Sequence, residues 1–287
     1  SRTINLTQPT AISVAAVSQT NVSCNGGSNG SATASAAGGT GTLSFNWTPY
    51  GGTASTAAGL TAGTYTCTVT DANACLAIRT FTITEPTAIS VLSVSQTNVS
   101  CNAGSNGAAT ISASGGTGTL EYSIDNSTYQ ASNQFTSLSA NTYTVYVQDA
   151  NNCVASATAV VNQPNVALSV SATATTNVNC FGQSTGTINV TTSGGTLPFS
   201  FIWNSNQTTE DLSAIPSGTY SLVVTDGNGC AFPLSQLITE PLAALTLTET
   251  HQDAVCVNGE TGSIDLTVSG GTSPYSYSWN NGLTTQD

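Results

Sequence analysis

Apolar and polar residues alternate along many short segments of this chain, and the clearest example begins at Tyr65. Tyr65, Cys67 and Val69 are separated from one another by threonines. Neighbouring side chains of an extended strand point to opposite faces, so this pattern predicts one buried and one hydrated face. Gly, Asn and Pro residues interrupt the pattern at short intervals, as they do between strands. For the first part of the chain we predict six strands, at about 10–18, 30–37, 42–48, 53–60, 64–70 and 77–84.

One set of motifs begins four times along the chain, each time at a cysteine. These cysteines are 77, 79 and 76 residues apart, and a Gly-Gly-Thr follows each of them. The four cysteines are Cys24, Cys101, Cys180 and Cys256. The residues 23 positions after them are Trp47, Ile124, Trp203 and Trp279. In the first three sets a Tyr-led strand, an Asp-x-Asn-x-Cys turn, a further strand and a proline follow.

A fixed period of this kind is the signature of tandem folding units. We place the first repeat at 9–85, the second at 86–163, the third at 164–240 and a truncated fourth at 241–287. Residues 1–8 match the strand that precedes Pro86, so we expect them to be the last strand of a preceding repeat. We therefore expect the native protein to extend in both directions.

Each unit reads as a small all-β domain. A period of about 77 residues with six or seven short strands favours an immunoglobulin-like β-sandwich. A mixed β-helix is the weaker alternative, because its period would be shorter. Only Thr-Glu-Pro-Thr-Ala separates Ile83 from Ile89, and proline restricts both its own backbone and that of its predecessor. We predict tandem sandwiches that form a semi-rigid rod.

The eight cysteines favour a disulfide-stapled secreted protein, because small sandwiches bury little core. From the recurrence of the motifs we pair Cys24 with Cys75, Cys101 with Cys153 and Cys180 with Cys230. Each pair requires both cysteines at the same end of a sandwich, and hence an odd number of strands from the first through the Tyr-led strand. Bridges between neighbouring repeats are the alternative. Cys256 has no partner in this scheme. We interpret Cys67, at an inward position, as a buried apolar thiol, with a reactive or intermolecular cysteine as the alternative.

Charge narrows the range of partners. The chain has a formal net charge of −12, with Arg2 and Arg79 as its two basic residues and no lysine. A chain this acidic lacks the basic surface that nucleic-acid-binding proteins use to neutralise phosphates. Binding to an anionic membrane surface is disfavoured for the same reason. We expect no membrane insertion in this segment, since no apolar run approaches the ~18 residues needed to span a bilayer. The absence of lysine also excludes the Lys–Asn isopeptide bonds that staple some bacterial pilins.

Catalytic chemistry has little support in the sequence, and we expect no enzyme here. His251 is the single histidine and has no counterpart in the other repeats, so a Ser-His-Asp triad is poorly supported. Glu210 and Asp211 are adjacent, but neighbouring side chains on a strand point to opposite faces, so these two residues make a poor acid/base pair. No Cys-x-x-Cys motif or histidine cluster suggests zinc. We expect no cofactor.

Two sets of repeated residues allow a binding interpretation as well as a structural one. The Asp-x-Asn pairs could ligate calcium, but Asp and Asn also form tight turns by bonding their own backbone. The candidates are Asp71, Asn73, Asp149, Asn151, Asp226 and Asn228. Trp47, Trp203 and Trp279 could stack on sugars, but their constant register favours core packing.

The assembled pattern resembles the SprB-type repeat of Bacteroidota surface adhesins. The resemblance rests on Val-Ser-Cys-Asn-Gly at 22–26, the Gly-Gly-Thr followed by Phe45-Asn-Trp47, and the segment from Gly63 to Cys75. It covers essentially the whole chain, although Ile124 and Cys67 depart from it. It implies a very large extracellular protein, exported by the type IX system, that acts in gliding motility or attachment.

The leading hypothesis is a structural and adhesive segment of a cell-surface adhesin or filament. Its partners would be further repeats of the same chain, identical chains in a filament, or surface polysaccharide. One alternative is an array of carbohydrate-binding modules, assisted by calcium or not. Another is a set of accessory domains attached to an extracellular enzyme. Burial of the tryptophans would weaken the carbohydrate hypothesis.

Overall fold

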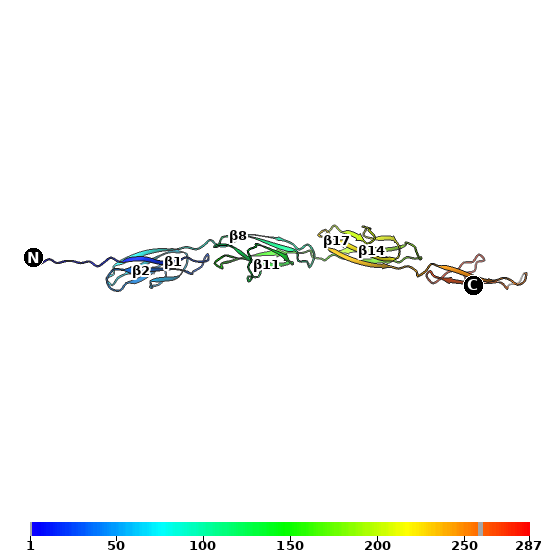
Figure 1. The fold of residues 1–287 in the computed structure, drawn as a ribbon, viewed down its shortest axis with the longest axis horizontal. Helices are drawn as coiled ribbons and strands as arrows, with labels where there is room; N and C mark the ends of the chain where they lie inside the picture. The colour runs from blue at the N-terminus through cyan, green and yellow to red at the C-terminus, as the bar shows by residue number, and fades with distance from the viewer. Residues whose placement is uncertain (1, 258–260) are drawn as a thin grey trace. The chain divides into compact units, whose positions relative to one another are not determined.

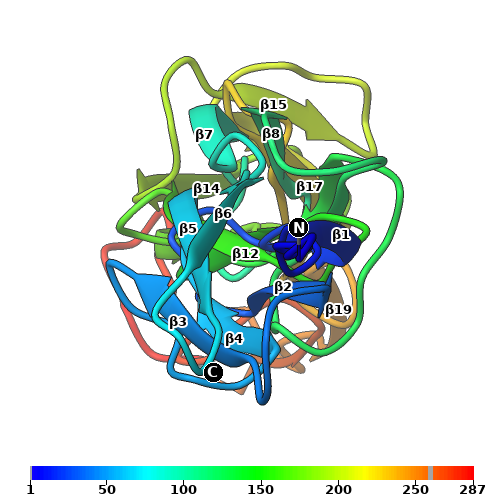
Figure 2. The ribbon, with the colours of Figure 1, turned by 90° about the vertical axis from the view of Figure 1, so that its left-hand side faces the viewer.

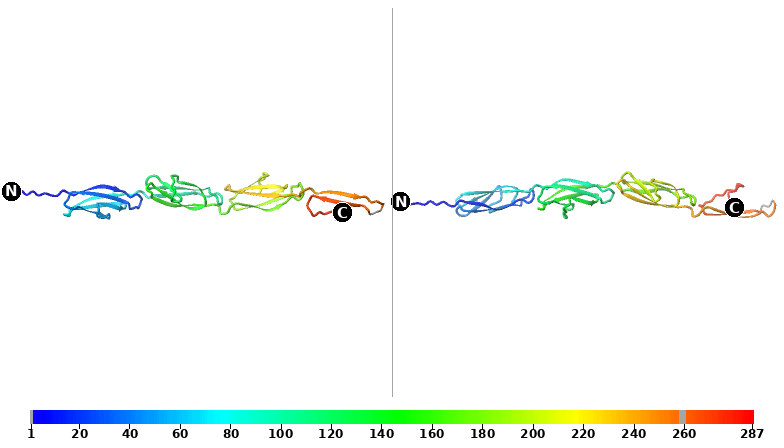
Figure 3. Two further views of the ribbon diagram at one scale, coloured as in Figure 1. Left: turned by 60° about the horizontal axis from the view of Figure 1, so that its bottom comes forward. Right: turned by 45° about the horizontal axis from the view of Figure 1, so that its top comes forward.

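A computed structural model describes residues 2–257 and 261–287 of the chain. The described residues form strands β1 to β20 and the turns between them, without a helix. The ribbon in Figure 1 and the two further views in Figure 3 are accordingly built of strand arrows and loops. None of these residues forms a helix that is long and apolar enough to cross a membrane.

The first repeat consists of two small antiparallel sheets, whose strands are labelled in Figure 2. One sheet has the order β1-β2-β4 and the other the order β3-β5-β6. The six strands agree with the predicted ones to within three residues at either end. They are β1 (Ser13–Thr20), β2 (Gly30–Ala37), β3 (Ser44–Thr48), β4 (Thr56–Leu60), β5 (Gly63–Thr70) and β6 (Leu76–Ile83).

The second and third repeats have the same two sheets. The second repeat contains β7 (Ser90–Thr97), β8 (Gly107–Ser114), β9 (Glu121–Ser123), β10 (Gln134–Leu138), β11 (Asn141–Gln148) and β12 (Val154–Val161). The third contains β13 (Ser169–Thr176), β14 (Gly186–Ser193), β15 (Ser200–Trp203), β16 (Leu212–Ile215), β17 (Gly218–Thr225) and β18 (Ala231–Ile238). The described part of the fourth contains the hairpin β19 (Thr246–Gln252) and β20 (Ser263–Ser269).

This topology confirms the immunoglobulin-like prediction. The two sheets correspond to strands A-B-E and C-F-G of an immunoglobulin domain, with no strand in the place of D. The Tyr-led strand also carries a tyrosine corner, in which the hydroxyl bonds a carbonyl four residues upstream. Tyr65 donates to Thr61 O at 3.1 Å, Tyr143 to Ser139 O at 3.0 Å, and Tyr220 to Pro216 O at 2.9 Å. The three repeats thus share a topology and a corner motif.

The cores follow the alternation read from the sequence. In β5, Tyr65, Cys67 and Val69 are buried, and the threonines between them lie half-exposed. Trp47 and Trp203 each belong to a cluster of buried hydrophobic residues. Their indole N–H groups are satisfied within the fold, because each donates to a backbone carbonyl at 2.9 Å. Core packing of these two rings is therefore what the structure shows.

The second repeat builds the equivalent place without tryptophan. Ile124 is half-buried, and the strand β9 ends one residue before it. Ser123 is fully buried there, and its hydroxyl donates to a carboxylate oxygen of Asp125 at 2.8 Å. A polar turn thus replaces the aromatic ring in this repeat.

The described structure separates into two units. One comprises Ser1–Asn98 with Ser105–Asn162, and the other comprises Val99–Gly104 with Gln163–Asp287. Our repeat boundaries remain a prediction; residue 1, within the proposed preceding strand, and residues 258–260 lie outside the described residues. Residues 2–12 form no strand.

Truncating the core tryptophan of the third repeat tests this packing. We expect Trp203→Ala to lower the free energy of unfolding of that repeat by about 3–5 kcal/mol, because it removes a large buried side chain and leaves a cavity. Ile202, on the same strand, is 58% exposed, so Ile202→Ala should cost less than about 0.5 kcal/mol. Amide hydrogen exchange in β15 and β17 measures both changes. Equal losses of unfolding free energy in the two variants would contradict the assignment of Trp203 to the core.

Candidate functional site at the repeat joints

A buried aspartate organises the turn that follows the Tyr-led strand. One oxygen of Asp71 accepts the backbone N–H groups of Asn73 and Cys75, each at 2.9 Å. The other accepts the N–H of Thr40 at 2.8 Å. Asp149 and Asp226 make the corresponding three bonds in their repeats. All three carboxylates are at most 6% exposed, so these bonds take the place of water.

These hydrogen bonds favour the charged carboxylate. The N–H groups of Cys75 and Thr40 lower the pKa of Asp71 below its ordinary value. At Asp226, burial alone would raise the pKa. The N–H groups of Cys230, Thr196 and Asn228 outweigh that effect, and the net pKa is lowered.

The repeated Gly-Gly-Thr brings the third N–H group to the aspartate. Gly38 and Gly39 both adopt positive φ, at +85° and +71°. A side chain on Gly38 would collide with the carbonyl of Ala11, and one on Gly39 would press on the Asp71 side chain at 3.1 Å. Glycine is therefore needed at both positions for the Thr40 amide to reach the carboxylate.

Two disulfides connect neighbouring repeats. Cys24 is bonded to Cys153 and Cys101 to Cys230, each pair with Cα atoms 5.6 Å apart. Our pairing of Cys24 with Cys75, Cys101 with Cys153 and Cys180 with Cys230 is therefore wrong. The alternative, bridges between neighbouring repeats, is the arrangement found. In both cases the loop cysteine of one repeat reaches the turn cysteine of the next.

Strand direction explains the correction. A hydrogen bond from Val22 N to Thr84 O places the Cys24 loop beside the end of β6. β5 pairs antiparallel with β6 along its whole length, so the turn after β5 lies at the other end of the sandwich. Eight strand residues span about 26 Å, whereas the Cα atoms of a disulfide are at most ~7 Å apart. The number of strands from β1 through β5 is odd, as the rule required, but β3 and β4 run in the same direction, so the parity rule fails.

The turns of the second and third repeats also contribute an asparagine to the joint. The side-chain Nδ2 of Asn151 donates to the carbonyl oxygen of Ser23 at 3.0 Å, next to the first disulfide. Asn228 donates to the carbonyl oxygen of Ser100 at 3.0 Å, next to the second. The Asp-x-Asn-x-Cys motif therefore has three separate tasks: the aspartate shapes the turn, the asparagine bonds the preceding repeat, and the cysteine links to it.

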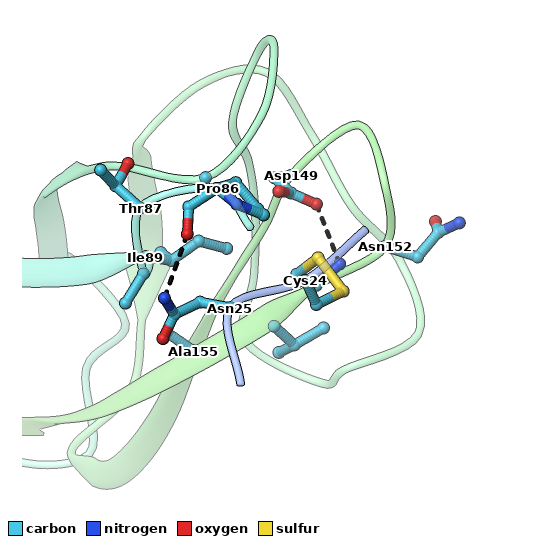
Figure 4. Close-up of a pocket in the computed structure, with 12 residues that line it drawn as sticks. Cys24, Asn25, Pro86, Thr87, Ile89, Asp149, Asn152 and Ala155 are labelled. Carbon is cyan, nitrogen blue, oxygen red and sulfur yellow. Dashed lines mark hydrogen bonds between the residues drawn. A yellow bond between two sulfur atoms is a disulfide. The ribbon is translucent and has the colours of Figure 1, made fainter. Parts of the chain in front are cut away.

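The chain that leaves a repeat is held by the same loop. Gly26 N donates to the Glu85 carboxylate at 2.6 Å. Asn25 Nδ2 donates to Pro86 O at 3.0 Å, a bond drawn as a dashed line in Figure 4. In the next joint, Ala103 N donates to Gln163 Oε1 and Asn102 Nδ2 to Pro164 O, both at 2.8 Å.

The third repeat keeps one of these two bonds. Gly182 N donates to Glu240 at 2.6 Å. Phe181 stands where the first two repeats have asparagine, so the bond to the proline carbonyl has no counterpart.

The remaining described cysteines divide into two kinds. Cys75 occupies the turn position, and Cys180 and Cys256 the loop position, and all three are exposed free thiols. Cys67 is free and fully buried, and burial raises the pKa of its thiol. This environment supports the interpretation of Cys67 as a buried apolar residue.

The structure gives the other candidate residues no common site. A groove of about 380 Å³ lies beside the first disulfide, but its one carboxylate, Asp149, already accepts three N–H groups. No group of three or more His, Cys, Asp or Glu residues that could hold a metal occurs within 2–257 and 261–287. Calcium binding at the Asp-x-Asn pairs remains an untested prediction, and the contacts there are those of a turn. His251 is exposed, and its Nδ1 lies 3.2 Å from Oε2 of Glu249.

These features define a class of protein: tandem immunoglobulin-like sandwiches clamped to one another by disulfides. The family model of the SprB repeat matches the sequence four times, at residues 16–52, 93–128, 172–208 and 248–284. The matches cover about half of the chain, and the chain belongs to the SprB repeat family. Such repeats occur in cell-surface adhesins, and the chain is a repeat segment of that kind.

Solved structures with some likeness also consist of tandem domains. The N-terminal eight Ig domains of Down syndrome cell adhesion molecule are 11% identical, with 80% of this chain and 42% of that chain covered and a TM-score of 0.32. Extracellular domains 3–5 of Drosophila OTK are 10% identical (69% and 86% covered, TM-score 0.26). A tetra-tandem repeat in the extending region of a large adhesion protein is 12% identical (91% and 87% covered, TM-score 0.26). The chain spans about two fifths of the first structure. No curated protein matches the chain.

Trypsin distinguishes the two disulfide schemes, because the chain offers it only Arg2 and Arg79. After free thiols are alkylated and the protein is denatured without reductant, cleavage after Arg79 separates Cys24 from Cys153. We expect the two large fragments to stay joined on a non-reducing gel and to separate when reduced. Fragments that separate before reduction would restore the pairing within repeats. A Cys24→Ser variant is the control, since its fragments should separate in both conditions.

Asp71 and Asp226 should make stability depend on acid. Their depressed pKa values stabilise the folded protein above the unfolded carboxyl pKa of about 4, and this contribution is lost as pH falls through the folded pKa. We expect Asp71→Asn/Asp226→Asn to melt below the wild type at pH 7, and the two melting curves to converge towards pH 2. Circular dichroism at a series of pH values measures this. A difference in melting temperature between variant and wild type that stays constant across pH would contradict this expectation.

Proposed function

We propose that the chain is a stiff spacer within an extracellular adhesin, which serves attachment to surfaces or gliding motility after export by the type IX system. The observation that carries the proposal is the closed joint. At each of the two complete joints, a disulfide and an asparagine side chain link the loop of one repeat to the turn of the next. A joint held at several points restricts bending more than a single peptide connection does.

The chemistry of the surface supports a structural role. Trp47 and Trp203 are buried, so they offer no aromatic platform for sugar rings. The turn carboxylates are occupied by backbone N–H groups. Disulfides persist in oxidising compartments, which suits an extracellular segment. On this proposal, length and stiffness are what the segment supplies to the adhesin, and the repeats of the same chain are its main partners.

The joint between the first two repeats can be tested by a distance measurement. Spin labels attached by non-cysteine chemistry at exposed Ala58 and Thr158 report on the separation of the two sandwiches. We expect a narrow distance distribution in the oxidised protein and a broad one in Cys24→Ser/Cys153→Ser. Cys180→Ser is the matched control, because that thiol is free and exposed, and it should leave the distribution narrow. A broad distribution in the oxidised wild type would overturn the stiff spacer.

The attachment role requires the producing cell. Cells that carry serine at Cys24, Cys153, Cys101 and Cys230 should display as much protein as wild-type cells, by surface antibody labelling, but retain fewer cells on a surface under flow. Equal retention at equal display would argue against a spacer that works in attachment.

A further inference from the structure

The two disulfides overlap along the chain. The segment enclosed by Cys24 and Cys153 contains Cys101, and the segment enclosed by Cys101 and Cys230 contains Cys153. Each bond joins residues that are 129 positions apart. This overlap arises because each bond connects a loop to the turn of the next repeat, and pairing within repeats would create three separate closed loops instead.

The overlap shortens the covalent route through the molecule. Cys24 and Cys230 are 206 positions apart in the sequence. The shortest covalent route passes from Cys24 to Cys153, back along the chain to Cys101, and through the second disulfide to Cys230. This route contains only the 52 positions between Cys101 and Cys153. At about 3.6 Å per residue, a fully stretched chain would span ~190 Å by this route and ~740 Å without the disulfides.

We propose that the overlapping disulfides act as an extension limiter, which restricts how far the repeats can lengthen when the segment is pulled. This inference deepens the proposed function and rests on it for its biological role, since a spacer in an adhesin bears load. A force applied at the two ends passes through the disulfides and the middle of the second repeat. The segments 25–100 and 154–229 each connect the same two linked points by 77 positions, so they stay slack even when the 52-position route is taut.

The second repeat consequently bears load in an unusual way. The pulled segment runs from Cys101 to Cys153 and contains β8, β9, β10 and β11. Its outer strands β7 and β12 lie outside the taut route. Unfolding of the first or the third repeat adds no length to the chain between Cys24 and Cys230 beyond the 52-position limit.

Single-molecule force spectroscopy on the full chain, held by its two ends, tests the limiter through its total contour length. Relative to the oxidised wild type, Cys24→Ser/Cys153→Ser leaves one disulfide and a 77-position route, so we expect a gain of 25 positions, about 90 Å. Serine at all four paired cysteines should give a gain of 154 positions, about 550 Å. Cys180→Ser should change nothing, because Cys180 is outside both bonds.

Three outcomes would overturn the limiter. The first is a wild-type contour as long as that of the four-serine variant. The second is a gain of about 100 positions in Cys24→Ser/Cys153→Ser, and the third is any lengthening in Cys180→Ser, since both are expected from pairing within repeats. The measurement is independent of the cell assay. If the contour lengths are as predicted but four-serine cells attach normally, the limiter stands and its use in attachment is refuted. Contour lengths that differ from the prediction refute the limiter itself.

Discussion

The joints of this protein depend on one buried carboxylate per repeat. In each complete repeat the aspartate after the Tyr-led strand accepts three backbone N–H groups, and one of them comes from the Gly-Gly-Thr segment on the other side of the same sandwich end. A charged group with three donors holds a turn firmly, because a buried carboxylate without partners is costly. The positions of the asparagine and the cysteine two and four residues later follow from that turn. Without it, neither would meet the preceding repeat.

Chain entropy alone does not choose between the two disulfide schemes. On the loop-closure model, closing about 50 residues lowers the entropy of the unfolded chain by the equivalent of ~4 kcal/mol, and closing about 130 residues by ~5 kcal/mol. The difference is small, whereas the geometric difference is decisive, because the cysteines of one repeat lie a full strand length apart. The sandwiches hold their own cores with tyrosine corners and, in the first and third repeats, a buried tryptophan, so their cysteines are available for the joints.

The exit from each repeat shows how a short connection becomes a joint. The Thr-Glu-Pro segment is held from three sides: Val22 donates to Thr84, Gly26 to Glu85 and Asn25 to Pro86. The second joint has two of these bonds, from Ala103 to Gln163 and from Asn102 to Pro164, with glutamine in place of glutamate, so an acceptor oxygen is what the position requires. These bonds and the disulfide act on the same loop, and the peptide connection and the covalent bridge are therefore parts of one structure.

Much of this architecture was determined by the sequence alone. The alternation in the Tyr-led strand, the recurring cysteines and the turn residues predict the strands, the sandwich and the repeat, because each depends on local periodicity and on backbone preferences. The buried state of Trp47 and Cys67 also follows from their register. The disulfide partners, and the bond from Asn151 to Ser23, were decided only by the tertiary structure. Both depend on which end of a sandwich each loop occupies. That end is set by the segment between Trp47 and Thr56, which crosses to the other sheet without forming a strand of its own, so that β3 and β4 run in the same direction. The spacing of the cysteines is the same in either scheme, so a sequence that repeats cannot distinguish a partner in its own repeat from one in the next.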